Sequence, residues 1–304
     1  MRIVVVDPSR VIHRSVTEIL AASGHEALCF TDAGEALARV AADETVACVL
    51  TSLETHPLDG FELCWQLRLL ANAPRPLAIL VMSSAHGSRS LGEVLDSGAD
   101  DFMSKPPGRD ELIARLRATE RLLGLQRELI RQADTDHLSQ LLNRGAFLRR
   151  AEHLAERLVD GTTPEAPMTA LLIDIDHFKT INDRHGHAVG DAAIRAVAGV
   201  LRETGALSCR WGGEEFALLV EGQGPGAAAV VAHNVRRRCA ALRVPTPGEE
   251  RVGLTVSIGV ATWSGRDGMD GVMRRADVAL YAAKAGGRDR VSMMANDAFI
   301  ECIG

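Results

Sequence analysis

The sequence predicts an α/β protein of two domains joined by a long helix. Short continuous apolar runs alternate with helical patterns in the first hundred residues, and one apolar stripe at helical spacing spans residues 109–134. The second half has strand-like segments around a glycine and acid turn, and 304 residues suffice for two cores. We therefore expect domains at 1–108 and 135–296, a helical linker at 109–134 and a tail at 297–304.

The first domain is expected to be a doubly wound parallel sheet. Residues 3–6, 46–50 and 77–82 are uninterrupted apolar runs, which are typical of strands buried on both faces, and residues 9–23 and 60–70 have helical patterns. In such sheets the functional crevice lies at the carboxyl ends of the strands. The polar residues expected there are Asp7, Ser52, Ser83, Ser84 and Lys105.

The linker carries its apolar residues on one helical stripe. They are Leu112, Ile113, Leu116, Leu122, Leu123, Leu129, Ile130 and Ala133. Leu116, Leu123 and Ile130 keep a seven-residue step, which favours a two-stranded coiled coil and hence a homodimer. The alternative is a helix that packs only on its own domain.

Three carboxylates in the second half point to phosphoryl chemistry. The apolar run 170–175 contains Asp174, and the turn 211–216 brings two glycines and the pair Glu214 and Glu215 between strand-like segments. Alternation along a strand sends the two glutamates to opposite sides. Clustered carboxylates are stabilised by a hard divalent cation, which is how Mg²⁺ is held beside nucleotide phosphates. The alternative for the glycine and acid string alone is a solvated turn.

Composition narrows the class of protein. The net charge of −6 gives no sign of a nucleic-acid surface, and no apolar run is long enough to span a membrane. The six cysteines lack CxxC pairs and zinc spacing, which is typical of reduced residues in a cytoplasmic protein.

Five separated motifs give a specific resemblance across residues 134–293. They lie at 135–144, 174–191, 211–216, 254–261 and 276–291. In these motifs the chain resembles the GGDEF family of diguanylate cyclases, in its Glu-Glu variant. The resemblance implies a nucleotidyl cyclase palm-like domain with a mostly antiparallel sheet. It also implies that two facing subunits condense two GTP into cyclic di-GMP and release two pyrophosphates, with two Mg²⁺ (or Mn²⁺) per GTP.

The resemblance also implies roles for individual residues. Asp174, the backbone carbonyl of Ile175 and Glu215 match metal ligands, and Glu214 matches a general base or a ligand of a second metal. Lys284 and Arg288, four apart and so expected on one helix face, match residues that grip the β and γ phosphates. The other substrate-binding positions are Asn182, Asp191 and His187 for guanine, and Phe178, Lys179, Gly212 and Gly213.

The first domain resembles the receiver domain of response regulators in a form that has lost phosphorylation. The usual pair of acids is Asp7-Pro8 here, and Ser52 stands at the phosphoacceptor position, seven residues before Asp59. A serine cannot form the acyl phosphate. Ser84 and Lys105 match the switch hydroxyl and lysine. With fourteen acidic against eight basic side chains in residues 1–106, this domain is expected to be controlled by a regulatory protein or a ligand.

One departure concerns feedback. Many diguanylate cyclases have an inhibitory product site whose Arg-x-x-Asp begins nine residues before the first glycine of the turn, and Glu203 and Ala206 stand at those positions. Arg236 alone matches a secondary arginine, so no such site is expected. The alternative function is a catalytically silent module that binds GTP or cyclic di-GMP and acts through protein contacts.

Overall fold

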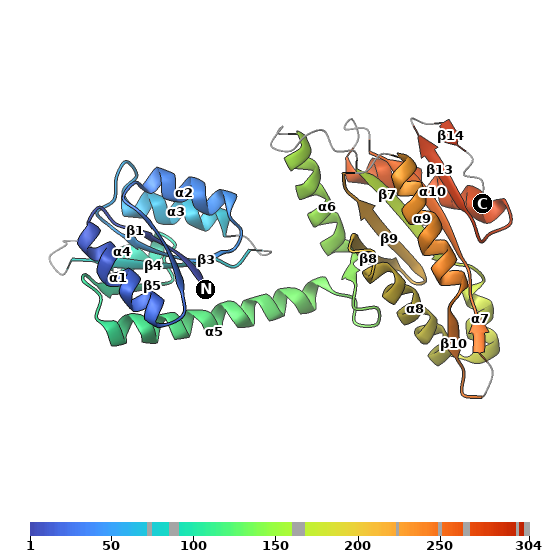
Figure 1. The fold of residues 1–304 in the computed structure, drawn as a ribbon, viewed down its shortest axis with the longest axis horizontal. Helices are drawn as coiled ribbons and strands as arrows, with labels where there is room; N and C mark the ends of the chain where they lie inside the picture. Colours follow the sequence, from blue (N-terminus) through green and yellow to red (C-terminus); the bar gives the residue numbers. More distant parts are fainter. Residues whose placement is uncertain are drawn as a thin grey trace. The chain divides into compact units, whose positions relative to one another are not determined.

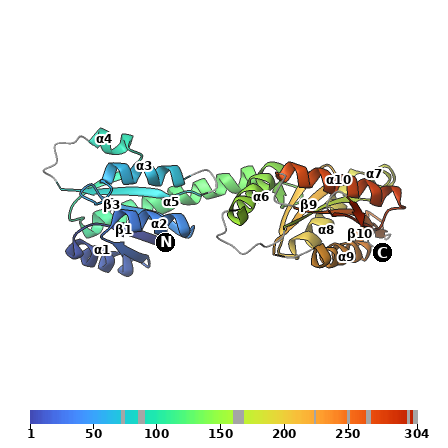
Figure 2. The same cartoon turned by 90° about the horizontal axis from the view of Figure 1, so that it is seen from above.

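The computed structural model divides into two compact units, Met1–Arg131 and Gln132–Gly304 (Figures 1 and 2). It describes residues 1–71, 75–84, 91–159, 168–222, 225–248, 251–263, 268–295 and 298–300. No helix in these ranges is long and apolar enough to cross a membrane. Five cysteines in the same ranges are free thiols, and Cys302 lies outside them.

The first unit is built on a parallel sheet of order β2-β1-β3-β4-β5. Its strands are β1 (Arg2–Val6), β2 (Glu26–Phe30), β3 (Val46–Ser52), β4 (Ala78–Ser83) and β5 (Asp101–Ser104). The doubly wound sheet predicted from the apolar runs is confirmed. β2 was not among the predicted strands, although residues 27–30 are apolar, and as an edge strand it has side chains that are only partly buried.

Helices cover both faces of this sheet (Figure 1). The core on one face includes residues of α1 (Arg10–Ala22) and α5 (Arg109–Asp134). The core on the other face includes residues of α2 (Ala33–Ala42), α3 (Gly60–Leu70) and α4 (Leu91–Asp96). Each strand of the centre is therefore buried on both sides, which is why β1, β3 and β4 read as uninterrupted apolar runs.

The packing of helix α5 contradicts the predicted coiled-coil contact at Leu116 and Leu123. Leu116 and Leu123 are 1% and 2% exposed and belong to the core of the first unit, so they cannot form the contact of a coiled coil. For this part of the helix, packing on its own domain is the right alternative. The exposed leucines of α5 are Leu122, Leu125 and Leu129, at 50%, 65% and 65%. Their spacing of three and four residues gives a second stripe on the solvent side.

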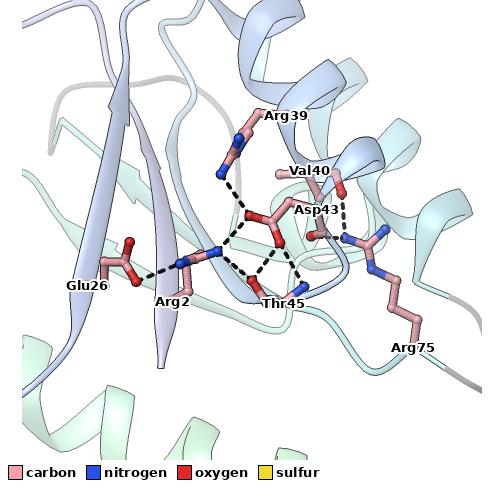
Figure 3. A network of polar contacts seen from close by, with 7 residues as sticks. All are labelled: Arg2, Glu26, Arg39, Val40, Asp43, Thr45 and Arg75. Carbon is pink, nitrogen blue, oxygen red and sulfur yellow. Dashed lines mark hydrogen bonds and ion pairs between the residues drawn. The ribbon is translucent and has the colours of Figure 1, made fainter.

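Polar contacts tie the amino-terminal edge of the same sheet together (Figure 3). The Asp43 carboxylate accepts hydrogen bonds from Arg2, Arg39 and Thr45. The Thr45 hydroxyl, together with Arg2, lowers the pKa of Asp43 to about 2. Arg75 donates to the backbone carbonyls of Val40 and Asp43. This network fixes the edge opposite to the carboxyl ends of the strands, where function is expected.

The second unit has a mixed sheet of order β14-β13-β12-β7-β9-β8-β6, with four antiparallel pairings among the six described. Its strands are β6 (Leu142–Asn143), β7 (Thr169–Ile175), β8 (Leu207–Gly212), β9 (Glu215–Val220), β12 (Val256–Thr262), β13 (Val291–Ala295) and β14 (Ala298–Ile300). A separate hairpin joins β10 (Arg243–Pro245) and β11 (Arg251–Gly253). Within the predicted tail at 297–304, residues 298–300 form β14, and 297 and 301–304 lie outside the described residues.

Helices lie on both faces of the second sheet as well. The core on one face includes residues of α7 (Phe178–His185), α8 (His187–Arg202) and α9 (Pro225–Ala240), and the other includes residues of α6 (Arg144–Val159) and α10 (Met269–Ala285). Gly259 of β12 lets α10 approach closely, because a Cβ there would lie 2.1 Å from the Ala276 carbonyl oxygen. This approach brings the end of α10 to the end of β7.

Candidate active site

The carboxylates predicted from the sequence meet at one end of the central strands. Asp174 of β7 is directly opposite Glu215 of β9 in the antiparallel register. Glu214 lies in the tight turn between β8 and β9, where Gly213 has a φ of +53°, a conformation that favours glycine. The predicted hairpin is therefore present, and both acids sit at its tip.

One lysine approaches this group of acids. Lys284, in the last turn of α10, places its Nζ 2.8 Å from Asp174 Oδ2. Burial raises the pKa of Asp174 in spite of this lysine, and burial together with the Asp174 charge raises the pKa of Glu215. Within the described ranges, the side chains of Glu214 and Glu215 form no hydrogen bond or ion pair. The site therefore holds more negative charge than its own cation compensates.

The donor atoms fit a divalent cation, although the site is not a finished cage. No group of three or more His, Cys, Asp or Glu side chains in the described part of the chain has the arrangement of a metal site. Mg²⁺ usually takes one or two carboxylates and completes its shell with waters and substrate phosphates. Asp174, Glu215 and the Ile175 carbonyl are oxygen donors of that kind, so a preformed cage of three acids is not required.

A second group of predicted residues lies on α7 and α8. Gly190 allows Asn182 to pack against α8, because a Cβ on Gly190 would lie 1.9 Å from Asn182 Oδ1. This Oδ1 atom is buried and has no hydrogen-bond partner among the residues described. Asp191, His187 and Lys179 are exposed, and Phe178 is half-buried beside Gly190.

Arg288 is not where helical spacing predicts it. α10 ends at Ala285 and is followed by Gly286, so Lys284 and Arg288 do not share a helix face, and that expectation is wrong. Arg288 lies in a turn beyond the helix with a φ of +64°. Its side chain is exposed.

The first motif, at 135–144, supports the hairpin. Arg210 of β8 donates to the Gly213 carbonyl at 2.8 Å and lies 3.2 Å from Asp136, so it connects the two motifs. Sequence reasoning missed this arginine, although its place in a strand next to the turn was visible. Gln140 has a φ of +57°, a conformation that favours glycine.

The predicted polar residues of the first unit also converge. Lys105 Nζ lies 2.8 Å from Asp7 Oδ2, 3.1 Å from Ser52 Oγ and 3.0 Å from Glu54 Oε2. Ser52 donates to Glu54 Oε2 at 2.6 Å, and Ser84 donates to Glu54 Oε1 at 2.8 Å. The sequence analysis missed Glu54, whose only signal was an acid two residues after Ser52.

Glu54 is strongly held as an anion. Burial would raise its pKa, but the hydrogen bonds from Ser52, Lys105 and Ser84 prevail and lower it to about 2. Hydrogen bonds with Asp7 and Glu54 likewise raise the pKa of Lys105 against the effect of its burial. We call Asp7, Ser52, Glu54, Ser84 and Lys105 the closed cluster.

Comparison with known proteins supports the same division. The model of the diguanylate cyclase GGDEF domain matches residues 133–290, more than half of the chain. The chain belongs to the GGDEF diguanylate cyclase family. A second model, the response regulator receiver domain, matches residues 3–117. The first unit is therefore a receiver domain and the second a GGDEF domain.

The chain is also similar to curated proteins and to solved structures. The response regulator PleD of Caulobacter vibrioides is 30% identical over 302 residues, which cover 95% of this chain and 65% of that protein. The chain thus spans just under two thirds of this relative. The coiled coil and GGDEF domain of DgcB from Caulobacter crescentus, solved with c-di-GMP, is similar at a TM-score of 0.54 and 33% identity, over 60% of this chain and 99% of that one. Diguanylate cyclase SiaD of Pseudomonas aeruginosa, solved with its activator SiaC, has a TM-score of 0.54 and 31% identity, over 61% and 72%.

Residues at and near the positions of the missing feedback motif have partners within the GGDEF domain. Glu203 forms an ion pair with Arg238, and Arg202 donates to the Ser139 carbonyl at 2.8 Å. Arg236 pairs with Asp289 at 2.9 Å. Beside Ala206 lies a cavity of about 520 Å³ that is also lined by Glu221, Arg237 and Arg238.

Proposed function

We propose that this protein is a diguanylate cyclase that condenses two GTP into cyclic di-GMP with release of two pyrophosphates. The observation that carries the proposal is the pair of opposed acids Asp174 and Glu215, with Glu214 beside them and Lys284 as the only cation paired with them in the described ranges. Members of the family that lose catalysis usually lose acids or glycines of this turn, and this chain retains them.

The chemistry follows from the charges. Asp174, the Ile175 carbonyl and Glu215 would hold Mg²⁺ or Mn²⁺, which would offset the negative charge that develops at the α-phosphate. Glu214 accepts the proton of the ribose 3′-hydroxyl or holds a second cation. With a metal on the acids, Lys284 would be available to the triphosphate, because the metal would supply the positive charge that Lys284 now supplies to Asp174.

Guanine recognition is assigned to α7 and α8. Asn182 Oδ1 is a buried acceptor without a donor in the described structure, and Asp191 is an exposed carboxylate one residue after Gly190. Together an amide and a carboxylate can read the N1 and N2 donors of guanine, which adenine lacks. His187, Phe178 and Lys179 complete this side of the substrate, and Gly212 and Gly213 leave room at the hairpin.

The reaction requires two subunits, since each holds one GTP. We assign the homodimer contact to the exposed leucines of α5, Leu122, Leu125 and Leu129, which continue the spacing of a coiled coil. The buried Leu116 and Leu123 belong to the receiver core instead.

The receiver domain is proposed to work without phosphorylation. In receivers the phosphoryl group sits on the acceptor residue and contacts a switch hydroxyl and a lysine. Here the Glu54 carboxylate contacts Ser52, Ser84 and Lys105, which are the residues at those three positions. Glu54 thus stands in for the phosphoryl group, and control passes to a regulatory protein, a ligand or protein concentration.

Incubation of the purified chain with GTP and Mg²⁺ tests the activity. We expect pyrophosphate and cyclic di-GMP from the wild type and neither from Glu214→Gln. Binding of GTP without any product in the wild type would favour the silent module instead.

A second experiment tests the receiver. Acetyl phosphate or beryllofluoride with Mg²⁺ should leave the oligomeric state and the cyclase rate unchanged. Glu54→Ala should change the cyclase rate, because it removes the carboxylate that contacts Ser52, Ser84 and Lys105. A phosphoryl group found by mass spectrometry on an acid of residues 1–108, with a matching change in rate, would contradict this part of the proposal.

A further inference from the structure

The turn that carries Arg288 has an uncommon backbone. Gly287, Arg288 and Asp289 have φ values of +116°, +64° and +45°. Two consecutive residues other than glycine in this region are unfavourable and persist only when surrounding contacts hold them. Since α10 has already ended, these contacts and not the helix decide where the Arg288 side chain lies.

Asp176 holds one side of the turn. Its side chain is 4% exposed, and its Oδ2 accepts a hydrogen bond from the Asp289 backbone amide at 3.0 Å. The same carboxylate accepts from the hydroxyls of Thr255 and Ser257 at 2.7 Å and 2.6 Å. Asp176 therefore fastens the turn to the ends of β7 and β12, two residues beyond Asp174.

Arg236 of α9 holds the other side. Its Nη1 donates to Asp289 Oδ1 at 2.9 Å and to the Asp289 carbonyl at 3.3 Å. The Arg236 side chain is 19% exposed, whereas its neighbours Arg237 and Arg238 are exposed and contact Asn234 and Glu203. Of the three arginines 236–238, only Arg237 and Arg238 are therefore solvent-exposed, whereas Arg236 is directed at the turn.

We infer that Arg236 and Asp176 are positioning residues that hold the turn 287–289 so that Arg288 meets the β and γ phosphates of GTP. This inference rests on the proposed GTP site. The amide of Asp289 is fixed by Asp176, and its carbonyl and carboxylate are fixed by Arg236. Arg290 adds a hydrogen bond from Nε to the Arg288 carbonyl at 3.2 Å. The Arg288 side chain itself forms no hydrogen bond or ion pair in the ranges described.

The test measures binding by calorimetry with Mg²⁺, using GMP and a GTP analogue whose α–β bridge cannot be cleaved. Arg236→Ala should weaken binding of the analogue about tenfold, as Arg288→Ala does, because one charge-assisted phosphate contact is lost. Binding of GMP, which lacks the β and γ phosphates, should not change. The double variant should bind the analogue no more weakly than Arg288→Ala alone, since Arg236 acts through Arg288.

Arg237→Ala is the matched control, because it removes the adjacent arginine without touching the turn. Asp289→Asn provides a second variant that keeps the backbone contact with Asp176 and removes the charge pair with Arg236. The inference is overturned if neither Arg236→Ala nor Asp289→Asn weakens the analogue, if GMP binding falls equally, or if the effects of Arg236→Ala and Arg288→Ala add. A wild type that binds the analogue but forms no cyclic di-GMP would sink the proposed activity and leave this inference standing.

Discussion

The two domains each set a lysine against an aspartate at the carboxyl end of a central strand. Lys105 lies 2.8 Å from Asp7 in the receiver domain, and Lys284 lies 2.8 Å from Asp174 in the GGDEF domain. The difference is a third group. Glu54 fills the receiver site and binds Lys105 and two serines, whereas the side chains of Glu214 and Glu215 form no hydrogen bond or ion pair in the described GGDEF domain.

In the receiver site the polar groups already have partners, whereas the GGDEF site has acids that we propose bind a cation. In the closed cluster the charges and hydroxyls already have partners, so a cation or phosphoryl group would have to displace existing contacts. In the GGDEF domain burial, and after it repulsion by the charge of the neighbouring acids, raises the pKa values of Asp174 and Glu215. A bound cation relieves that repulsion, so binding is favoured there.

Neutralising one acid of the GGDEF site is expected to have the largest effect. Glu214→Gln and Asp174→Asn should each lower the rate of cyclic di-GMP formation by about 10² to 10⁴-fold, since a base or a charged ligand is lost. Asp174→Asn should also weaken Mg²⁺-dependent GTP binding. Product analysis by chromatography measures both rates.

Glu221→Gln is the matched control, because Glu221 is exposed beyond the far end of β9. If Glu214→Gln or Asp174→Asn formed cyclic di-GMP at the rate of this control, the substituted acid would not take part in the reaction.

The linker helix should show two different responses to lysine. Leu123→Lys buries an unpaired charge in the receiver core and should lower the free energy of unfolding by about 3 kcal/mol or more. Leu129→Lys, at an exposed position, should leave that stability within about 0.5 kcal/mol and instead weaken the dimer.

Chemical denaturation and light scattering separate these outcomes. Activity of Leu129→Lys should depend steeply on protein concentration. An unchanged dimer in both Leu125→Lys and Leu129→Lys would show that the exposed stripe of α5 is not the contact between subunits.

Acid should affect the GGDEF site before the closed cluster. Burial raises the pKa values of Asp174 and Glu215 above their ordinary 3.8 and 4.5, so these acids take up protons earlier as the pH falls. Because metal ligands must be ionised, Mg²⁺-dependent GTP binding should weaken from neutral pH down to 4.5, by up to about tenfold per pH unit for each proton. Calorimetry across this range measures the slope.

The pKa of Glu54 is shifted in the opposite direction to those of Asp174 and Glu215. Its pKa is lowered from 4.5 to about 2, so its stabilising effect is complete above 4.5 and is lost as the pH falls toward 2. Since its side chain is 48% exposed, Glu54→Gln should cost only about 1 kcal/mol at neutral pH. Equal stability of Glu54→Gln and wild type at neutral pH would mean that the cluster is not closed.

The sequence predicted the strands and the acids of the GGDEF site better than the contacts of the receiver domain and the end of α10. The central strands and the acids at their ends follow from apolar runs and strand register, which are local properties. Glu54 could not be predicted, because only the loop after β3 turns its carboxylate back toward Ser52 and Lys105. Leu123 was misassigned because a seven-residue step does not distinguish a contact with the same chain from a contact with a second one. Gly286 and Gly287, a typical helix end, were the neglected signal that Arg288 lies beyond α10.

The smallest effect is expected from added product. The three arginines of the run 236–238 are engaged, Arg236 with Asp289, Arg237 with Asn234 and Arg238 with Glu203, and Glu203 places a negative charge where the family motif has arginine. Micromolar cyclic di-GMP present from the start should therefore leave the initial rate unaltered, apart from competition with GTP. Glu203→Arg combined with Ala206→Asp restores the motif beside the existing cavity and should create noncompetitive inhibition. Tight noncompetitive inhibition of the wild type, retained in Arg238→Ala, would show that the product binds elsewhere on the GGDEF domain.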